Sequence, residues 1–345
     1  MKSSEGVIAI AGAGRMGRGI ALTFAYQGYQ VKLLDIKYRD TEEFQQLKST
    51  AFHEIKNQLD VLVLGDVILQ DSIPAILERI EVSSIHSDNE ASWKEAEILF
   101  EAVPEVLEIK EEVFKGICPH LSPTALIAST TSSFSANELV EFVTTKERFM
   151  NTHWLNPAYL IPLVEVSPSN ETSKESLKEM FLLLERIGKV PVECKPSPGF
   201  IVPRIQALAM NEASRLVEEG VASMEDIDKA SKVGFGLRFA VLGLLEFIDW
   251  GGADTLFHAS NYLQHSIEDD RFETPEIIKK KMADGEIGMK AGKGFYSFDE
   301  KNINDYQIQT LQKFIDLMKH LGLMEDNHFH NGMAGLRKQT ESKGV

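Results

Sequence analysis

A histidine and a glutamate stand out in the apolar stretch NTHWLNPAYLIPLVEV, which spans residues 151–166. His153 ends one β-rich run, the Asn156-Pro157 pair is typical of a turn, and Glu165 lies between two valines in the returning run. An unpaired carboxylate on such a strand would be costly, and a neighbouring imidazole removes that cost. The carboxylate would also fix the imidazole tautomer and stabilise imidazolium. The pattern predicts an acid–base pair. The alternative is a core histidine and an unrelated surface acid.

A glycine-rich loop, AGAGRMGRG, follows the first β-rich run and opens the first helical pattern. Gly12, Gly14 and Gly17 form G-x-G-x-x-G around Met16. In that pattern the first glycine allows a tight turn, the second admits a pyrophosphate, and the third lets helix and strand pack closely. The free N–H groups at the helix start then face the phosphates. The loop predicts a dinucleotide site, with a glycine-rich turn that binds no nucleotide as the alternative.

An acid at the end of the second β-rich run completes the dinucleotide pattern. Asp35 lies where a carboxylate can bind the ribose hydroxyls of the adenosine. The same charge repels a 2′-phosphate, so the sequence favours NAD over NADP. Lys37 and Arg39 are close enough in sequence to weaken that preference.

The first half of the chain alternates strand-like and helix-like patterns, which predicts a doubly wound parallel sheet. The expected strands are 7–11, 31–35, 97–103 and 125–130, followed by RFMNTHW, LVEVS and KVPVEC within 148–194. The expected helices are 16–27, 41–67 with a break near Gly65, 110–117, 135–142 and 174–187. Ligands of such sheets bind beyond the carboxyl ends of the strands. Ser132 and Ser133 in STTSSF therefore could bind a substrate oxygen, although serines there also cap helices.

A change of pattern follows KPSPGF at residues 195–200. Helices are expected at 205–219, 224–233, 243–267, 274–282 and 306–321, with a loose polar tail from Asp326. We therefore expect an N-terminal domain at 1–196, an all-α domain at 197–299, and a C-terminal helix with tail at 300–345.

Composition excludes several classes of partner. The chain of 345 residues carries 36 Lys and Arg against 52 Asp and Glu, a formal net charge of −16. This balance argues against nucleic acid and anionic membranes as main partners. Two cysteines, Cys118 and Cys194, give no disulfide framework and fit a reducing compartment. We expect a cytoplasmic protein that acts on a small molecule without a metal.

Several ordered motifs together resemble the 3-hydroxyacyl-CoA dehydrogenase family over about residues 7–298. The matching pieces are GAGRMGRGIA, EAVPEVLEIKEEVF, STTSSFSANEL, HWLNPAYLIPLVEV, KPSPGFIVPRI, EEGVASMEDID and GMKAGKGFY. The resemblance implies a Rossmann-type doubly wound parallel sheet followed by an all-α C-terminal domain that forms a homodimer. It also implies oxidation of a secondary alcohol to a ketone with NAD.

The resemblance assigns roles to individual residues. By position, His153 is implied as the general base, Glu165 as its orienting partner and Ser132 as a ligand of the substrate hydroxyl. Asn156 is implied to support the site, in the H-x-x-N-P pattern. Two further residues, Glu105 and Lys110, fall where the family lines its cofactor site.

Two departures from the family pattern bear on the substrate. Pro203 in FIVPRI replaces an asparagine whose amide lies at the catalytic site, although proline also suits the first turn of a helix. Arg238 resembles the branch that acts on free hydroxy acids, where arginine can hold a carboxylate; the alternative is an exposed helical arginine. The segment 41–67 has only Lys48 and Lys56 as cations for a CoA 3′-phosphate.

Three functions remain open at this point. The first is oxidation of a short-chain L-3-hydroxyacyl-CoA such as 3-hydroxybutyryl-CoA. The second is NAD-dependent oxidation of a free carboxylate-bearing alcohol, similar to gulonate, carnitine or a pyridine carboxylate. The third is an NAD-binding structural protein without turnover, against which the intact pair of His153 and Glu165 argues.

Overall fold

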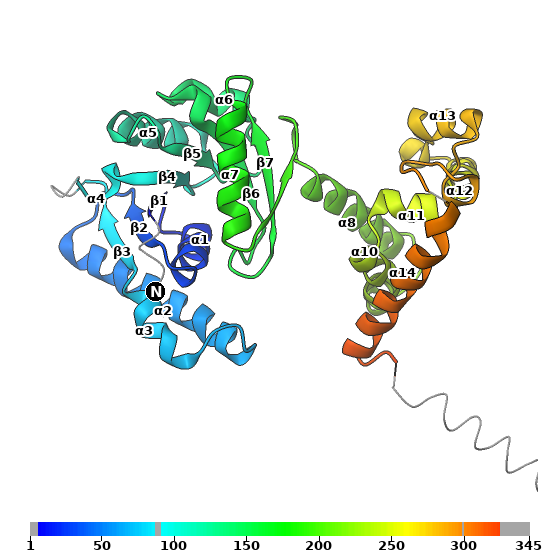
Figure 1. The fold of residues 1–345 in the computed structure, drawn as a ribbon, viewed down its shortest axis with the longest axis horizontal. Helices are drawn as coiled ribbons and strands as arrows, with labels where there is room; N and C mark the ends of the chain where they lie inside the picture. The colour runs from blue at the N-terminus through cyan, green and yellow to red at the C-terminus, as the bar shows by residue number, and fades with distance from the viewer. Residues whose placement is uncertain (1–5, 87–90, 299, 325–345) are drawn as a thin grey trace, which may run out of the picture. The chain divides into compact units, whose positions relative to one another are not determined.

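The computed structural model describes residues 6–86, 91–298 and 300–324. The chain divides into two compact units, Met1–Met210 and Asn211–Val345, and each is described by itself (Figure 1). The expected polar tail from Asp326 lies outside the described residues.

The first unit is built on one eight-stranded sheet with the strand order β3-β2-β1-β4-β5-β6-β7-β8. The strands are β1 (Val7–Ala11), β2 (Gln30–Asp35), β3 (Ile80–Ser84), β4 (Ala96–Glu101), β5 (Leu126–Ser129), β6 (Phe149–Trp154), β7 (Leu163–Pro168) and β8 (Val190–Glu193). Neighbouring strands pair in parallel except for β6 and β7, which pair antiparallel. The carboxyl ends of β1 to β6 therefore share one edge of the sheet.

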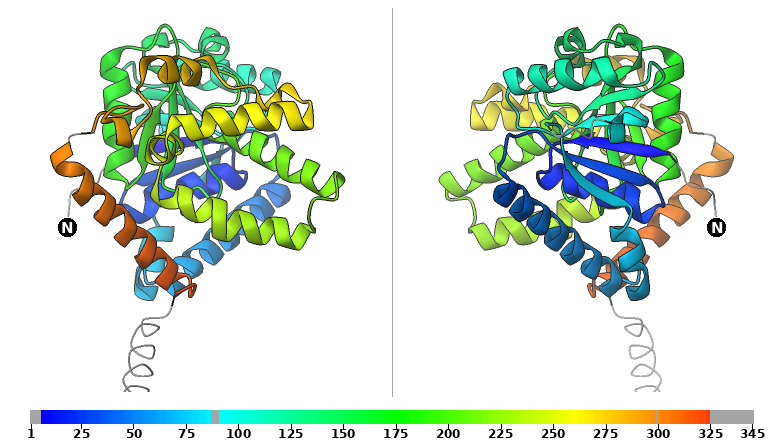
Figure 2. Two further views of the ribbon diagram at one scale, coloured as in Figure 1. Left: turned by 90° about the vertical axis from the view of Figure 1, so that its right-hand side faces the viewer. Right: turned by 90° about the vertical axis from the view of Figure 1, so that its left-hand side faces the viewer.

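Helices cover both faces of this sheet (Figures 1 and 2). They are α1 (Arg15–Tyr26), α2 (Thr41–Leu64), α3 (Ile73–Leu77), α4 (Ala91–Lys94), α5 (Leu107–Ile117), α6 (Ala136–Leu139) and α7 (Lys174–Arg186). One buried cluster joins the sheet to α1, α2, α3 and α7, and a second joins it to α4, α5 and α6. Two apolar layers on a mostly parallel sheet confirm the predicted doubly wound class.

The predicted elements of this unit are largely present, with three omissions: strand β3 and the short helices α3 and α4. Strand β3 was not predicted, although Ile80 and Val82 are buried and Glu81 between them is exposed, which is the alternation of a half-buried strand. The long helix α2 begins with a capping box between Asp40 and Glu43 and ends at Gly65, as expected. The predicted helix 135–142 is α6 followed by a short 3₁₀ turn, Val140–Phe142.

The second unit contains only helices within its described residues. They are α8 (Val202–Glu218), which begins in the first unit, α9 (Met224–Ala230), a π-helical turn (Ser231–Gly236), α10 (Leu237–Val241), α11 (Leu244–Gly251), α12 (Ala253–Ile267), α13 (Glu276–Asp284) and α14 (Glu300–His320). The all-α prediction is confirmed, but one predicted helix was too long. The predicted helix 243–267 breaks at Gly252, whose φ of 97° no α-helix accommodates. The predicted helix 224–233 is helical throughout, because α9 continues into the π-helical turn and α10.

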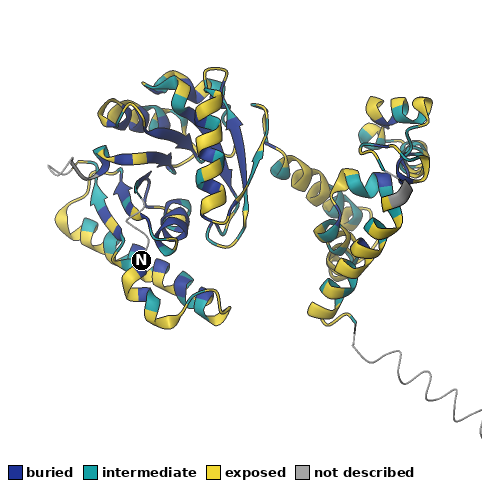
Figure 3. Ribbon diagram, in the orientation of Figure 1, coloured by how far each residue is buried: buried dark blue, intermediate teal, exposed yellow. Residues whose placement is uncertain are grey.

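Burial differs sharply between the two units. The strands of the first unit are mostly buried, whereas the helices of the second unit are mostly exposed or half-buried (Figure 3). Helix α8 has no buried residue. No helix among the described residues is both long and apolar enough to cross a membrane.

Candidate active site

The glycine loop lies at the carboxyl end of β1, and the structure explains why glycine stands at Gly12, Gly14 and Gly17. A Cβ on Gly12, whose φ is 115°, would lie 2.4 Å from the carbonyl oxygen of Ala102. A Cβ on Gly17 would lie 1.8 Å from the carbonyl oxygen of Gly12, so the close packing of loop and helix requires glycine there. A Cβ on Gly14 would meet no atom within 4 Å, so its backbone faces open space that a ligand could enter.

A cavity of about 430 Å³ lies in front of this loop, and its lining carries the kinds of group that bind a dinucleotide. Its lining is Gly12, Ala13, Gly14, Arg15, Met16, Asp35, Ile36, Lys37, Arg39, Leu47, Ala102, Val103 and Pro104. Helix α1 begins at Arg15, so its free N–H groups can hold a pyrophosphate, and the Asp35 carboxylate can hold a ribose. The structure thus brings Gly12, Gly14, Met16 and Asp35 together, with Gly17 packed behind them.

Asp35 already has protein partners. Its side chain is 4% exposed, its Oδ2 accepts a hydrogen bond of 2.7 Å from Nε of Arg39, and its Oδ1 accepts one of 3.3 Å from the Lys37 backbone N–H. A carboxylate has about four acceptor sites, so ribose hydroxyls still find lone pairs. The ion pair also holds Arg39 at the side of the cavity.

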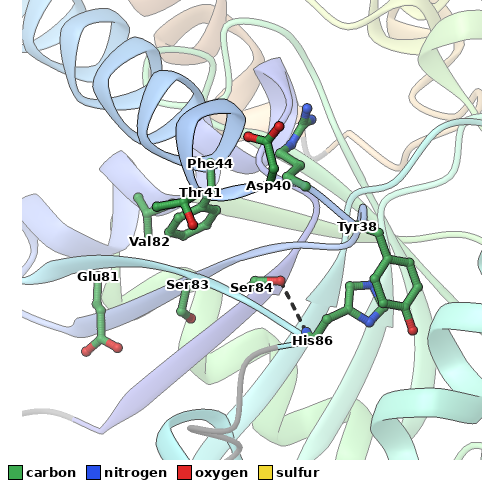
Figure 4. Close-up of a pocket in the computed structure, with 10 residues that line it drawn as sticks. Tyr38, Asp40, Thr41, Phe44, Glu81, Val82, Ser83, Ser84 and His86 are labelled. Carbon is green, nitrogen blue, oxygen red and sulfur yellow. Dashed lines mark hydrogen bonds between the residues drawn. The ribbon is translucent and has the colours of Figure 1, made fainter.

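A second cavity of about 520 Å³ adjoins Arg39 and is lined by residues of β3 and of the start of α2 (Figure 4). The rings of Tyr38 and His86 stack at one side of it, with centroids 3.5 Å apart. The His86 ring also bonds to the carbonyl of Ile36 at 3.0 Å, which ties the two strand ends together. The sequence reading did not find this pair, because the unpredicted β3 is what brings His86 beside Tyr38.

A buried charged cluster lies under the ends of β4 and β5. Lys110 of α5 is fully buried, and its Nζ lies 2.9 and 3.1 Å from the two carboxylate oxygens of Glu101 and 3.2 Å from Glu105. Glu101, also fully buried, accepts hydrogen bonds from the Val103 backbone N–H and the Ser129 hydroxyl. The sequence reading named Lys110 and Glu105 by resemblance. The sequence analysis did not identify Glu101. The only sign of its role was an acid next to the apolar residues of a predicted strand.

Glu105 organises the loop that follows β5. Its Oε1 accepts hydrogen bonds from the Thr131 hydroxyl at 2.5 Å, from the backbone N–H groups of Ser132 and Ser133 at 2.9 Å, and from the Ser133 hydroxyl at 2.7 Å. Burial raises the pKa of the Glu105 carboxyl, but the bonds from Thr131 and Ser133 and the charge of Lys110 outweigh it and lower that pKa to about 2. A carboxylate in this setting stays ionised.

The two candidate serines differ in what their hydroxyls do. The Ser133 hydroxyl is engaged by Glu105, whereas the exposed Ser132 hydroxyl makes no hydrogen bond within the described part of the chain. Ser129 pairs with Asn151 in the register of β5 and β6, and Asn151 donates to the carbonyl of Phe134 at 2.9 Å. This register brings the loop with Ser132 next to the end of β6, where His153 lies.

His153 and Glu165 are paired directly across β6 and β7. They are opposite each other in the antiparallel register, and Nδ1 of His153 lies 2.7 Å from Oε2 of Glu165. The histidine is 5% exposed and the glutamate is fully buried. With Nδ1 engaged, Nε2 is the ring nitrogen that remains for a ligand; it makes no hydrogen bond among the described residues. The predicted juxtaposition is therefore present, and the alternative of two unrelated residues is wrong.

The start of α8 completes the surroundings of this pair. Oε1 of Glu165 accepts two hydrogen bonds of 2.8 Å, from the backbone N–H groups of Ile201 and Val202. The ring of Phe200 stacks on the imidazole with centroids 4.8 Å apart, and Phe200 has a φ of 45°, which is rare for a residue with a side chain. Pro203 lies in the first turn of α8, where its missing N–H leaves no helical bond unmade.

The last two candidate residues have few protein contacts. Asn156 is exposed, follows β6 directly and is joined to Pro157 by a cis peptide bond. Arg238 belongs to α10 in the second unit and is exposed, with its guanidinium 5.6 Å from the centroid of the Phe247 ring. Both cysteines are free, and the described residues contain no group of His, Cys, Asp or Glu that could hold a metal ion.

Comparison with known proteins places both parts of the chain. Residues 7–197 match the model of the 3-hydroxyacyl-CoA dehydrogenase NAD binding domain, and residues 199–298 match that of the 3-hydroxyacyl-CoA dehydrogenase C-terminal domain. A probable 3-hydroxybutyryl-CoA dehydrogenase of Bacillus subtilis is 32% identical over 85% of this chain and 98% of its own length.

Two further relatives differ in substrate name. A solved 3-hydroxyacyl-CoA dehydrogenase of Archaeoglobus fulgidus aligns with a TM-score of 0.72 and 31% identity over 93% of this chain and 100% of its own. The 5-formyl-3-hydroxy-2-methylpyridine 4-carboxylate 5-dehydrogenase of Mesorhizobium japonicum is 28% identical over 89% of this chain and 96% of its own length.

Proposed function

Because this chain belongs to the 3-hydroxyacyl-CoA dehydrogenase family of NAD-dependent oxidoreductases, we propose that it oxidises the secondary alcohol of a short-chain L-3-hydroxyacyl-CoA, such as 3-hydroxybutyryl-CoA, to the 3-keto product. The observation that carries this proposal is the 2.7 Å contact between Nδ1 of the nearly buried His153 and Oε2 of Glu165. It is the arrangement that general acid–base chemistry needs.

His153 is the general base in this proposal. Its Nδ1–H donates to Glu165, so Nε2 carries the lone pair that takes the proton of the substrate hydroxyl. Glu165 then stabilises the imidazolium that forms. In the reverse direction, the protonated Nε2 returns a proton to the carbonyl oxygen.

The cofactor is held at the other end of the same sheet edge. The N-terminus of α1 and the loop around Gly14 hold the pyrophosphate, and Asp35 holds the adenosine ribose. Glu105 and Lys110 would support the cofactor site through their cluster, as the resemblance implies. Bound NAD supplies the acceptor for the hydride that leaves the substrate carbon. Ser132 offers its unengaged hydroxyl to the substrate oxygen, and Asn156 lines the same edge.

The test is NADH formation with hydroxyacyl-CoAs and free hydroxy acids, using the wild type, His153→Gln and His53→Gln as a control. His53 is an exposed histidine on α2. We expect His153→Gln to lower kcat by roughly 10²–10⁴, because it removes a positioned base. NAD affinity, measured by fluorescence titration, should stay the same. Full turnover by His153→Gln refutes the base assignment, and a wild type inactive on every substrate favours the non-catalytic NAD-binding alternative.

A free carboxylate-bearing alcohol is the second candidate substrate. Pro203 and Arg238 favour it, since Pro203 has no amide for the reacting carbonyl and the exposed Arg238 has a cation for a carboxylate. The pyridine-carboxylate dehydrogenase among the relatives supports this candidate by its name. Arg238→Met should then lose about 10- to 100-fold in kcat/KM on free hydroxy acids alone, the value of one charge-assisted bond. Equal activities of the wild type and the variant on every substrate would show that Arg238 does not bind the substrate.

A further inference from the structure

Lys189 is a buried charge that the chemistry above does not use. It directly precedes β8 and is 5% exposed. Burial lowers the pKa of its ammonium to about 8. A cation is retained in such a place only where other groups compensate its lost hydration.

The compensating groups are two main-chain carbonyls of one segment. The Nζ of Lys189 donates hydrogen bonds to the carbonyl oxygens of Ala158 at 2.6 Å and of Ile161 at 2.9 Å. It also lies 5.7 Å from the centroid of the Trp154 ring. The contacted segment, residues 155–162, connects β6 to β7 and begins two residues after His153.

The same segment packs against the helix that carries the glycine loop. A Cβ on Gly19 of α1 would lie 3.2 Å from the Cβ of Ala158, and the Thr23 hydroxyl approaches the Ala158 carbonyl at 3.4 Å. Ala158 is 2% exposed, so it is wedged between α1 and Lys189. Ala158 therefore contacts α1 on one side and Lys189 on the other, so Lys189 helps to hold the β6–β7 connection against α1.

We propose that Lys189 is a positioning residue of the active site, whose ammonium anchors segment 155–162, and with it Asn156 and the end of β6, against α1. The proposal rests on the proposed function for its effect on turnover. The anchoring itself is independent of the substrate. Without the lysine, the Ala158 carbonyl keeps only the 3.4 Å contact with the Thr23 hydroxyl, and the part-buried Ile161 carbonyl loses its donor. The segment that follows His153 then loses its fixed place.

The kinetic consequence falls on turnover more than on cofactor binding. The glycine loop and Asp35 do not contact Lys189, so the site for NAD stays intact. A base displaced by about 1 Å loses on the order of 10²-fold in rate. We therefore expect Lys189→Met to lower kcat by about 10- to 100-fold while the Kd for NAD changes less than about twofold.

The experiment compares Lys189→Met and Lys189→Gln with Lys178→Met, which removes the same charge from the exposed surface of α7. Gln keeps an N–H donor and should lie between wild type and Met in kcat. Hydrogen exchange of the backbone amides in 155–162, followed by mass spectrometry, reports the anchor directly. Its rate should rise in Lys189→Met, and by less in Lys189→Gln, while the strands β1 and β4 keep their protection.

Two results would contradict the anchor. In the first, Lys189→Met has the same exchange rate in 155–162 and the same kcat as Lys178→Met. In the second, the exchange rate of Lys189→Met rises evenly over the whole first unit. Lys189→Gln carries the test if Lys189→Met does not fold. A wild type without dehydrogenase activity defeats the proposed function, while the exchange measurement still decides whether Lys189 holds the segment.

Discussion

At the scale of single residues, both oxygens of Glu165 accept hydrogen bonds, one from a side chain and the other from the backbone. Oε2 accepts from His153, and Oε1 accepts from the backbone N–H groups of Ile201 and Val202. All of these partners donate a hydrogen bond, so only a side chain with two acceptor oxygens satisfies them. This explains why an acid can be fully buried on β7.

Glu165→Gln should therefore lower kcat by roughly 10²–10⁴ with little loss of stability. A glutamine has one oxygen, and if it serves Ile201 and Val202, its NH₂ group faces Nδ1 of His153. Nδ1 must then accept, Nε2 carries the proton, and the imidazole cannot act as a base. Single-turnover rates of hydride transfer measure the effect, and Glu165→Asp, which keeps the charge, should lose less. A Glu165→Gln variant at the wild-type rate would show that the tautomer is immaterial.

We predict that the ion pair of Asp35 and Arg39 governs the choice between NAD and NADP. In Asp35→Ser the carboxylate no longer repels a 2′-phosphate, and Arg39, now unpaired at the side of the cavity, can bind one. We expect the ratio of kcat/KM for NADP to that for NAD to rise by about 10- to 100-fold, which corresponds to one charge-assisted bond.

The double variant Asp35→Ser/Arg39→Met is the control for that prediction. It lacks the cation as well, so most of the NADP gain should disappear while NAD binding stays weakened. A double variant that uses NADP as well as Asp35→Ser does would contradict a role for Arg39.

At the scale of elements, the loops after β4 and β5 are joined by charge. Lys110 of α5 binds Glu101 at the end of β4, and Glu105 holds the loop after β5 through Ser132 and Ser133. The cluster fixes the loop that carries the candidate substrate serine. Its strength depends on the ionisation of Glu105, whose pKa is lowered from 4.5 to about 2.

This shift predicts a pH dependence of stability. Folding lowers the pKa of Glu105, so the ionised carboxylate stabilises the folded state. This contribution to stability is fully present above pH 4.5 and is lost as the pH falls toward 2. After a discount for the 39% exposure of the side chain, it amounts to about 1–2 kcal/mol. The difference in Tm between wild type and Glu105→Gln should be constant near pH 6 and shrink between pH 4.5 and 2.

Glu112→Gln, an exposed position on α5, is the control and should show no such change in Tm. A Tm difference for Glu105→Gln that is the same at pH 6 and pH 3 would mean that the pKa of Glu105 is not lowered by folding.

At the scale of the whole molecule, the helices from α8 onward expose many apolar side chains. Leu208 and Met210 of α8 are 69% and 63% exposed, and Leu245 of α11 is 46% exposed. Exposed apolar surface of this kind is typical of protein–protein interfaces. The apolar run 239–248, which motivated the expected homodimer, is only partly buried within the unit.

We predict that the chain is a homodimer through its all-α part, from α8 onward, as the resemblance implies. Sedimentation equilibrium at micromolar concentration should give twice the mass of the chain. Leu208→Asp/Met210→Asp should shift the equilibrium toward monomer, because two charges would be buried in the interface. Leu64→Asp, at an 85% exposed leucine of α2, is the matched control. A wild type that is monomeric at micromolar concentration would contradict the predicted dimer. A dimer that Leu208→Asp/Met210→Asp leaves unchanged would mean that the interface does not include these two residues.

Much of the first unit follows from the sequence by itself, because the signals are local. The glycine loop, the acid that ends β2 and the strand–helix alternation each depend on neighbouring residues, and the turn at Asn156-Pro157 between two β-rich runs predicts that His153 meets Glu165. The alternation of β3 was also local, and its omission was an error of interpretation rather than a limit of the sequence.

Only the tertiary structure decided which groups complete the site. The N–H groups of Ile201 and Val202 reach Glu165 from 36 and 37 residues away, and Lys189 reaches Ala158 from 31. Nothing in the local pattern of a helix start or of a lysine before a strand specifies such a partner. These contacts arise when the packed sheet brings distant backbone groups to one buried place, where each polar atom must find a partner because water is excluded.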